Sequence, residues 1–167
     1  MSTETLPAVK NEQRDRRIVV VAATYNEKYT SALLENCLEE LARLAPGVQV
    51  DVVRVPGAFE VPVMVRRALF SAEARPDAVI ALGVILRGST AHADLIGTAI
   101  TQELLRAACD SLTPVIHEVL LLNDAQQAEV RCLGTELNRG IESARAAVAM
   151  LNLIHPTAPQ AANSQHF

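Results

Sequence analysis

The architecture of this chain is set by the stretch AVIALGVILRGST, residues 78–90. Its first nine residues are apolar or glycine, which is typical of a strand buried on both faces of a parallel sheet. Four polar or small residues end that strand, and apolar residues at helical spacing then predict a long helix over 91–110. A buried strand followed directly by a helix indicates a β-α unit with its polar loop at the carboxyl end of the strand.

The same alternation continues on both sides of this unit. Three further segments rich in Val, Ile, Leu or Ala predict strands over 18–23, 48–55 and 115–122. Helical periodicity predicts helices over 29–45, 60–70 and 141–151. Asp124 with Gln127 resembles a capping box at the start of another helix, and Gly140 is expected to break that region. Because helices separate the strands, the pattern predicts a three-layer α/β/α sandwich with a parallel sheet.

One domain over residues 17–154 is predicted. Residues 1–16 are polar and aperiodic and are expected to form a flexible arm, whereas residues 155–167 are expected to form a tail. The net charge of −4 argues against a nucleic-acid or anionic-membrane partner. No apolar run has the length of a membrane span, and the first residues are polar, so a cytoplasmic location is predicted.

The cysteines and histidines do not predict a metal site. Cys37, Cys109 and Cys132 lack C-x-x-C pairing, and the four histidines have no ligand-like spacing with them. Cys37 and Cys109 fall within helical apolar patterns, so both are expected to pack in the interior rather than to act as nucleophiles.

Ligands of doubly wound sheets bind outside the carboxyl ends of the strands. This rule singles out the loops at 24–28, 56–60 and 87–92. Ser89 and Thr90 precede a helix N-terminus, where unpaired N–H groups favour phosphate, although an ordinary capped turn is the alternative interpretation. His92 lies in the first turn of that helix, where an imidazole can shuttle protons, but a lone helical histidine is also a common surface residue.

Three further side chains fit a phosphorylated or flat ligand. Arg131 offers a guanidinium that holds phosphate in bidentate geometry, with an ion pair to nearby Glu129 as the alternative. Tyr25 and Phe59 belong to a small aromatic set of two Tyr, three Phe and no Trp. Both fall in ligand-side loops, where a heteroaromatic ring would stack on them, and core packing is the alternative for Phe59.

Four stretches together resemble the lumazine synthase family. They are ATYN (23–26), VPGAFEVP (55–62), LGVILRGSTAH (82–92) and the segment 123–140. The second and third are the most specific, and their spacing is also that of the family. The resemblance covers residues 17–153 and implies a flavodoxin-like α/β fold with a four-stranded parallel sheet.

Members of this family condense 5-amino-6-(D-ribitylamino)uracil with 3,4-dihydroxy-2-butanone 4-phosphate, giving 6,7-dimethyl-8-ribityllumazine, phosphate and water. The resemblance therefore implies a transferase of riboflavin biosynthesis that uses two small-molecule substrates and neither a metal nor an organic cofactor. It also implies a homo-oligomer with active sites between adjacent subunits and a pentamer as the minimal unit. The segment 131–140 has no insertion relative to shell-forming members, so a pentamer, a decamer and an icosahedral shell of pentamers all stay open.

The resemblance assigns a role to each candidate residue. His92 would transfer protons. The pyrimidine and its ribityl chain would contact Tyr25, Ala58, Phe59, Glu60, Val84, Ile85, Leu86 and His117. The phosphate would be held by Ser89 and Thr90, with Arg131 supplied by a neighbouring subunit.

Departures from the family pattern keep an alternative open. Ala93 stands where the family usually has a bulky residue, His117 replaces an aromatic residue that covers the ligand, and Glu136 replaces a common basic residue. The first two changes favour a paralogue that binds flavin or lumazine without turnover, whereas His92 and Arg131 favour an active enzyme. A receiver-like signalling domain is not supported, because no acidic cluster follows the first strand.

Overall fold

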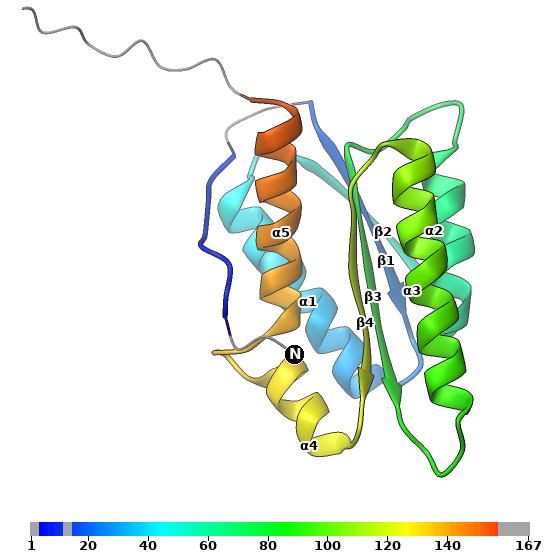
Figure 1. The fold of residues 1–167 in the computed structure, drawn as a ribbon. Coiled ribbons are helices and arrows are strands. Elements are labelled where there is room, and N and C mark those ends of the chain that lie inside the picture. The colour runs from blue at the N-terminus through cyan, green and yellow to red at the C-terminus, as the bar shows by residue number, and fades with distance from the viewer. Residues whose placement is uncertain (1–3, 12–14, 157–167) are drawn as a thin grey trace, which may run out of the picture.

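The computed structural model describes residues 4–11 and 15–156. Its four parallel strands form one sheet in the order β2-β1-β3-β4 (Figure 1). The strands are β1 (Arg17–Ala23), β2 (Gln49–Val55), β3 (Ala78–Leu86) and β4 (Val115–Leu122). The α-helices are α1 (Glu27–Leu44), α2 (Val61–Leu69), α3 (His92–Ser111), α4 (Ala125–Ala128) and α5 (Arg139–Ile154). This is the predicted flavodoxin-like arrangement, so the fold class is confirmed.

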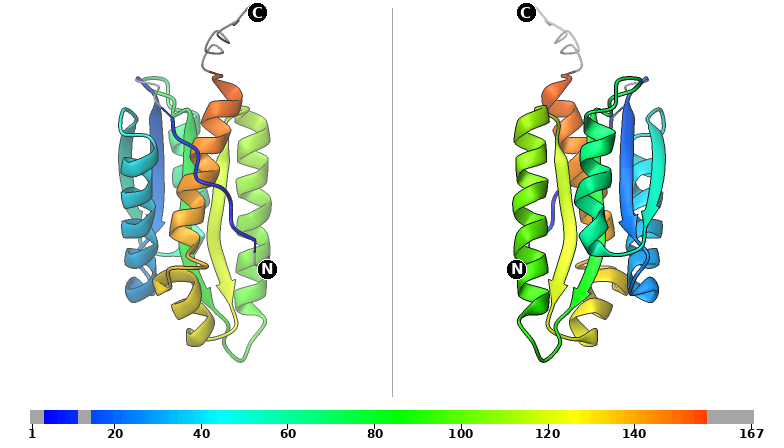
Figure 2. Two further views of the ribbon diagram at one scale, coloured as in Figure 1. Left: turned by 90° about the vertical axis from the view of Figure 1, so that its left-hand side faces the viewer. Right: turned by 90° about the vertical axis from the view of Figure 1, so that its right-hand side faces the viewer.

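Two helices cover each face of the sheet. Helices α1 and α5 pack on one face, and α2 and α3 pack on the other, as the side views of Figure 2 show. The side chains of β1 alternate between these two cores: Ile18 and Val20 face α1 and α5, whereas Val19 and Val21 face α2 and α3. A strand that is buried on both faces needs an apolar residue at every position, which explains the continuous apolar runs in the sequence.

The predicted break at Gly140 is wrong. Gly140 is the second residue of α5, and the Asn138 side chain caps this helix by accepting hydrogen bonds from the N–H groups of Gly140 (2.9 Å) and Ile141 (3.1 Å). A Cβ atom on Gly140 would lie 2.4 Å from the carbonyl oxygen of Leu33 in α1. The glycine therefore permits the close approach of α5 to α1 and does not interrupt a helix.

The chain between β4 and α5 is less regular than the sequence indicates. Asp124 caps α4 as predicted, because its Oδ1 accepts a hydrogen bond from the N–H of Gln127 (2.8 Å). However, α4 is only one turn long and continues as a π-helical turn, η2 (Glu129–Leu133). The helix predicted over 60–70 similarly begins as a 3-10 turn, η1 (Ala58–Glu60), before α2.

The predicted arm and tail are described only in part. Residues 4–11 contain no helix or strand and run alongside α5 (Figure 2). The Leu6 N–H donates to Glu142 (2.9 Å), and the Asn11 side chain donates to Asn152 (2.7 Å). Residues 1–3 and 12–14 of the arm, and residues 157–167 of the tail, lie outside the described residues.

The cysteines differ in their surroundings. Cys37 and Cys132 are buried, and desolvation raises the pKa of each thiol to about 12, which disfavours the nucleophilic thiolate. Cys109 is exposed, so its predicted packing in the interior of this chain is wrong. It lies two residues after the buried Ala107, on the outer side of α3.

Among the described residues, none of the helices combines the length and apolar character needed to cross a membrane.

Candidate active site

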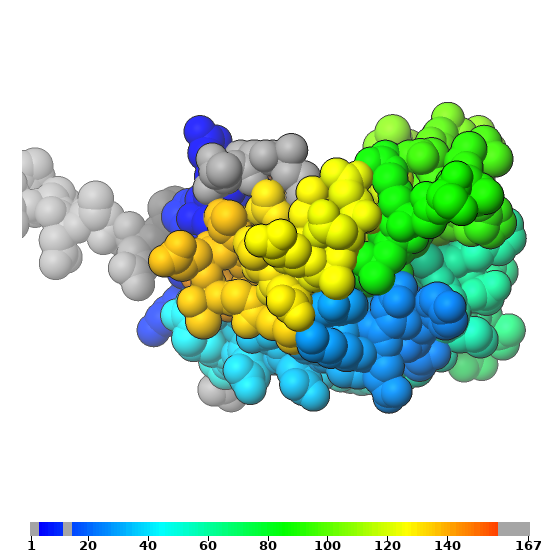
Figure 3. Space-filling model, turned by 90° about the horizontal axis from the view of Figure 1, so that it is seen from below, coloured from blue at the N-terminus to red at the C-terminus, as the bar shows by residue number. Residues whose placement is uncertain are grey.

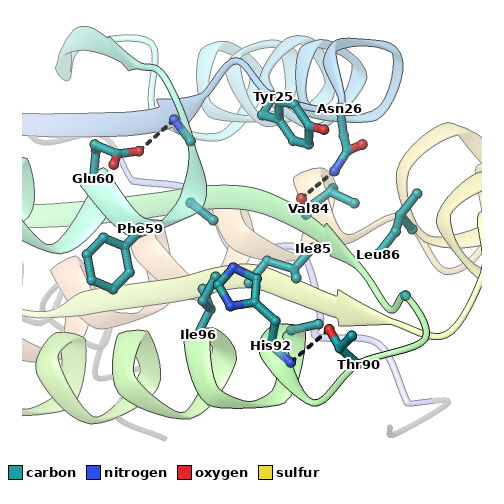
Figure 4. A pocket seen from close by; sticks show the side chains of 14 residues that line it. Tyr25, Asn26, Phe59, Glu60, Val84, Ile85, Leu86, Thr90, His92 and Ile96 are labelled. Atoms are coloured by element: carbon teal, nitrogen blue, oxygen red, sulfur yellow. Dashed lines mark hydrogen bonds between the residues drawn. The ribbon is translucent and has the colours of Figure 1, made fainter.

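A cleft of about 550 Å³ opens at the carboxyl end of the sheet, the edge at which the sequence predicts ligand binding (Figure 4). The loops after β1 and β2, the end of β3 and the start of α3 form its walls. Nine of the predicted site residues line it: Tyr25, Ala58, Phe59, Glu60, Val84, Ile85, Leu86, Thr90 and His92. The remaining lining residues are Asn26, Gly57, Gly88, Ala93 and Ile96.

Two large aromatic side chains stand exposed in this cleft. Tyr25 is 74% exposed and Phe59 is 64% exposed, so core packing, the alternative for Phe59, does not apply. Backbone hydrogen bonds join their loops, because the Thr24 N–H donates to Val55 O (2.8 Å) and the Tyr25 N–H donates to Pro56 O (2.9 Å). Exposed aromatic rings on two connected loops are typical of a site that binds a flat ligand.

Glu60 is held in place by its own loop. Its Oε2 accepts a hydrogen bond from the Gly57 N–H (2.9 Å), and a Cβ atom on residue 57 would lie 2.9 Å from that oxygen. No described residue donates to the second carboxylate oxygen, Oε1. The carboxylate is therefore oriented by one oxygen and can accept a hydrogen bond from a ligand hydroxyl with the other.

Asn26 lines the cleft and was missed by sequence reasoning. Its backbone has φ 61° and ψ 45°, the left-handed conformation that asparagine tolerates better than most non-glycine residues. Its side-chain Nδ2 donates to the carbonyl oxygen of Val84 (2.8 Å) and so ties the loop after β1 to the end of β3. The sequence feature that could have identified it is an asparagine at the turn between the first strand and the helix that follows.

His92 is the first residue of α3, and its imidazole extends into the cleft between Phe59 and the Thr90 end of the loop (Figure 4). Its backbone N–H lies 3.5 Å from the Thr90 hydroxyl oxygen. Ala93, which follows it, is buried at the cleft wall. Asp94 pairs with Arg87, so it does not orient the imidazole.

Ser89 and Arg131 do not line this cleft. Ser89 is exposed in the loop between two cleft residues. Arg131 belongs to a second hollow of about 590 Å³, formed by the end of β4 and the segment that follows it. In the part of the chain that the structure describes, no carboxylate lies within ion-pair distance of Arg131. Glu129 pairs with Lys28 (2.9 Å), and Glu118, which Arg131 affects only electrostatically, pairs with Arg139 (2.8 Å). The Arg131 guanidinium is therefore open to an external anion, but not to an anion in the same chain's cleft.

His117 also lies outside the cleft of its own chain. Its Nε2 is 2.8 Å from the Thr101 hydroxyl, and its Nδ1 accepts a hydrogen bond from the Val119 N–H (3.1 Å). Because Nδ1 is an acceptor, the neutral ring carries its proton on Nε2 and donates to Thr101. Desolvation lowers the pKa of His117, which also favours the neutral ring.

No group of three or more His, Cys, Asp or Glu side chains within residues 4–11 and 15–156 is arranged to hold a metal ion. The cleft instead offers aromatic faces, a fixed carboxylate, the end of a strand and an imidazole at a helix N-terminus. These groups suit the binding of a flat polar heterocycle and proton transfer beside an anion.

Comparison with known proteins gives one consistent result. The family model described as 6,7-dimethyl-8-ribityllumazine synthase matches residues 15–155. The 6,7-dimethyl-8-ribityllumazine synthase of Gemmatimonas aurantiaca is 40% identical, over 86% of this chain and 87% of its own length. Proteins of the same name from Rhodopseudomonas palustris and Thermococcus kodakarensis are each 38% identical, over 82% and 83% of this chain and 85% and 86% of their own lengths.

Proposed function

The chain belongs to the 6,7-dimethyl-8-ribityllumazine synthase family, and we propose that it is a transferase of riboflavin biosynthesis. It condenses 5-amino-6-(D-ribitylamino)uracil with 3,4-dihydroxy-2-butanone 4-phosphate, and it releases 6,7-dimethyl-8-ribityllumazine, phosphate and water. The observation that carries this proposal is the cleft itself, in which four separate segments bring two aromatic rings, a carboxylate and an imidazole around one cavity.

The pyrimidine substrate binds between the loops after β1 and β2. Tyr25 and Phe59 supply exposed rings for stacking on the heterocycle. Backbone groups of 84–86 at the end of β3 hydrogen-bond to the edge of the pyrimidine, and Ala58 contacts it. The ribityl chain lies against Glu60, whose free carboxylate oxygen accepts from a hydroxyl group.

The phosphate of the four-carbon substrate binds at the N-terminus of α3. Unpaired N–H groups and the partial positive charge at this end favour a dianion, and Ser89 and Thr90 add hydroxyl donors. Arg131 completes this half-site from an adjacent copy of the chain, since in its own chain it belongs to a separate hollow. His117 contacts the pyrimidine from that same adjacent copy.

The reaction moves protons at every step. The 5-amino group of the pyrimidine attacks the ketone carbon, and water leaves as the imine forms. Phosphate is then eliminated, and the ribityl-bearing amine closes the ring with loss of water. His92 stands at the start of α3 beside the phosphate half-site, so it transfers protons between the reacting nitrogen and oxygen atoms. Holding two substrates together in one cavity supplies much of the remaining rate.

We propose a head-to-tail interface in which each chain presents its cleft to one neighbour and its Arg131 hollow to the other. Such an interface forms a ring when the rotation between copies closes. We assign a pentamer as the minimal active unit, with decamers and icosahedral shells as larger assemblies of the same ring. The cytoplasm is the compartment proposed for the enzyme.

The test is a direct assay with both substrates and purified protein. Lumazine fluorescence and released phosphate should rise together at a one-to-one ratio, well above the uncatalysed background. Omitting either substrate is the control. A flat trace from folded protein that still binds flavin or lumazine would contradict the proposal and indicate a binding paralogue.

A further inference from the structure

We propose that Arg87 is a positioning residue for the phosphate half of this site, because it fixes the loop 88–91 without contacting the phosphate itself. This inference rests on the proposed function. Arg87 is the last residue before the loop, and its backbone N–H donates to Leu122 O (2.9 Å), continuing the ladder between β3 and β4. The side chain turns away from the cleft and toward the second hollow.

The loop has few restraints of its own. Residues 88–91 are all exposed, and a Cβ atom on Gly88 would meet nothing within 4 Å. Among the described residues, the only side-chain hydrogen bond made within residues 88–92 is the long one between the Thr90 hydroxyl and the His92 N–H (3.5 Å). An unrestrained loop loses conformational entropy when it closes on a ligand, and this cost weakens binding.

Arg87 supplies the missing restraint from outside the loop. Its Nε donates to Asp94 Oδ1 (3.1 Å), and its Nη2 donates to the same oxygen. Since Asp94 lies in the first turn of α3, this pair joins the two ends of the loop. Its Nη1 donates to the Asn123 side chain just after β4. The planar guanidinium thus holds three segments in one fixed geometry.

The third of these segments leads to Arg131. Asn123 is also fixed by its own backbone, because its N–H donates to the side-chain oxygen of Gln127 (3.1 Å) in α4, the turn that precedes η2. In the space-filling view, the residues leading into α3 (green) and those of the 120–133 region (yellow) lie side by side (Figure 3). Arg87 therefore links the loop of one active site to the segment that serves the neighbouring site.

Removing this restraint should raise KM for the four-carbon phosphate and leave KM for the pyrimidine nearly unchanged. In Arg87→Ala we expect KM for the four-carbon phosphate to rise on the order of tenfold, because a loop released from its geometry misplaces the phosphate donors. KM for the pyrimidine should stay within about twofold, since its half-site does not use this loop. The melting temperature should hardly change, because exposed ion pairs contribute little to stability.

Asp94→Asn separates positioning from direct contact with phosphate. It weakens the restraint but leaves the Arg87 charge in place, so positioning predicts the same selective rise in KM. If Arg87 instead binds phosphate directly, freeing it from Asp94 should leave that KM unchanged or lower it, and this result would overturn the proposal. The matched control is Arg66→Ala, which breaks a similar exposed pair with Asp110 (3.2 Å) away from the cleft and should change neither KM.

Calorimetric titration with inorganic phosphate makes the same comparison without turnover. The phosphate Kd should rise in both the Arg87 and the Asp94 variant and not in the Arg66 variant. Equal phosphate affinity in all four proteins would overturn the role of Arg87. Absence of product from the wild type, by contrast, would refute the proposed function, so the two failures are distinguishable.

Discussion

His92 is the single residue on which the proposed chemistry depends most. It is the one imidazole that lines the cleft among the described residues, and it stands at the N-terminus of α3, beside the region assigned to phosphate. The cleft also contains Glu60, but that carboxylate is engaged with Gly57 and faces the half-site assigned to the ribityl chain.

Replacing His92 by Ala should therefore slow turnover without weakening pyrimidine binding. General acid–base catalysis contributes on the order of 100-fold or more, so we expect kcat to fall by about that factor. The Kd for the pyrimidine, measured by fluorescence titration, should be unchanged. A variant with wild-type kcat would remove His92 from the mechanism.

Glu40 controls stability rather than chemistry. This buried residue of α1 accepts hydrogen bonds from Arg43 (2.8 Å to each oxygen) and from Arg145 of α5 (2.8 Å). The hydrogen bonds from Arg43 and, to a smaller extent, Arg145 together lower the pKa of Glu40 to about 2 against the opposing effect of burial. Since the folded pKa is below the ordinary value of 4.5, the stabilisation is present above pH 4.5 and is lost as the pH falls toward 2.

Glu40→Gln should lower the free energy of unfolding by about 2 kcal/mol at pH 7, with the difference from wild type shrinking between pH 4.5 and 2. Thermal melts at fixed protein concentration measure this. Glu103→Gln is the control, because Glu103 pairs with Arg106 at the same i,i+3 spacing on the surface (3.0 Å) and should change stability by less than about 0.5 kcal/mol. A pH-independent difference for Glu40→Gln would contradict the assignment.

At the level of helices and strands, the buried strands could be predicted well, because a short continuous apolar run between turn residues is typical of a strand covered on both faces. All four strands match their predictions to within a residue. For β1 and β3 the reason is burial on both faces, which demands continuous apolar sequence. The region 125–140 was predicted less well. Its single helical turn, π-helical turn and late capped helix depend on tertiary contacts such as that between Gly140 and Leu33, which local sequence does not reveal.

Gly140→Ala tests that explanation. The added methyl group would lie 2.4 Å from the backbone oxygen of Leu33, and backbone cannot move aside as a flexible side chain can. We expect the free energy of unfolding to fall by about 1–3 kcal/mol as α1 and α5 are pushed apart. Gly88→Ala, where the added group meets open space, should leave the melting temperature nearly unchanged. Equal effects of the two substitutions would contradict the role assigned to Gly140.

Considered as a whole, the molecule gathers most of the predicted site residues in one cleft and leaves Ser89, His117 and Arg131 outside it. Nine predicted residues meet in the cleft because their motifs end neighbouring parallel strands, whose carboxyl ends share one edge of the sheet. Arg131 and His117 lie elsewhere on the same chain. No sequence pattern within one chain specifies a site that a second copy completes, so these two residues could be proposed only by resemblance to the family.

Arg131→Ala should weaken the use of the four-carbon phosphate selectively. Loss of a charge-assisted contact corresponds to roughly a tenfold or greater rise in KM for that substrate, with little change for the pyrimidine. Steady-state kinetics with each substrate varied in turn measure the split, and Arg106→Ala on the outer surface of α3 is the control. Equal losses for both substrates would contradict the phosphate assignment.

Mixing two defective variants tests most directly whether active sites are shared between copies. His92→Ala lacks the proton-transfer group of the cleft, and Arg131→Ala lacks the cation of the second hollow. At low phosphate substrate each alone should therefore retain about a tenth of wild-type activity or less. When the two are unfolded together and refolded, roughly a quarter of the interfaces in a random ring pair an intact cleft with an intact Arg131. We predict recovery of about that fraction of wild-type activity. Co-purification of two tags verifies that hybrid oligomers have formed. If these hybrids show no more activity than the average of the two variants, the shared site is contradicted.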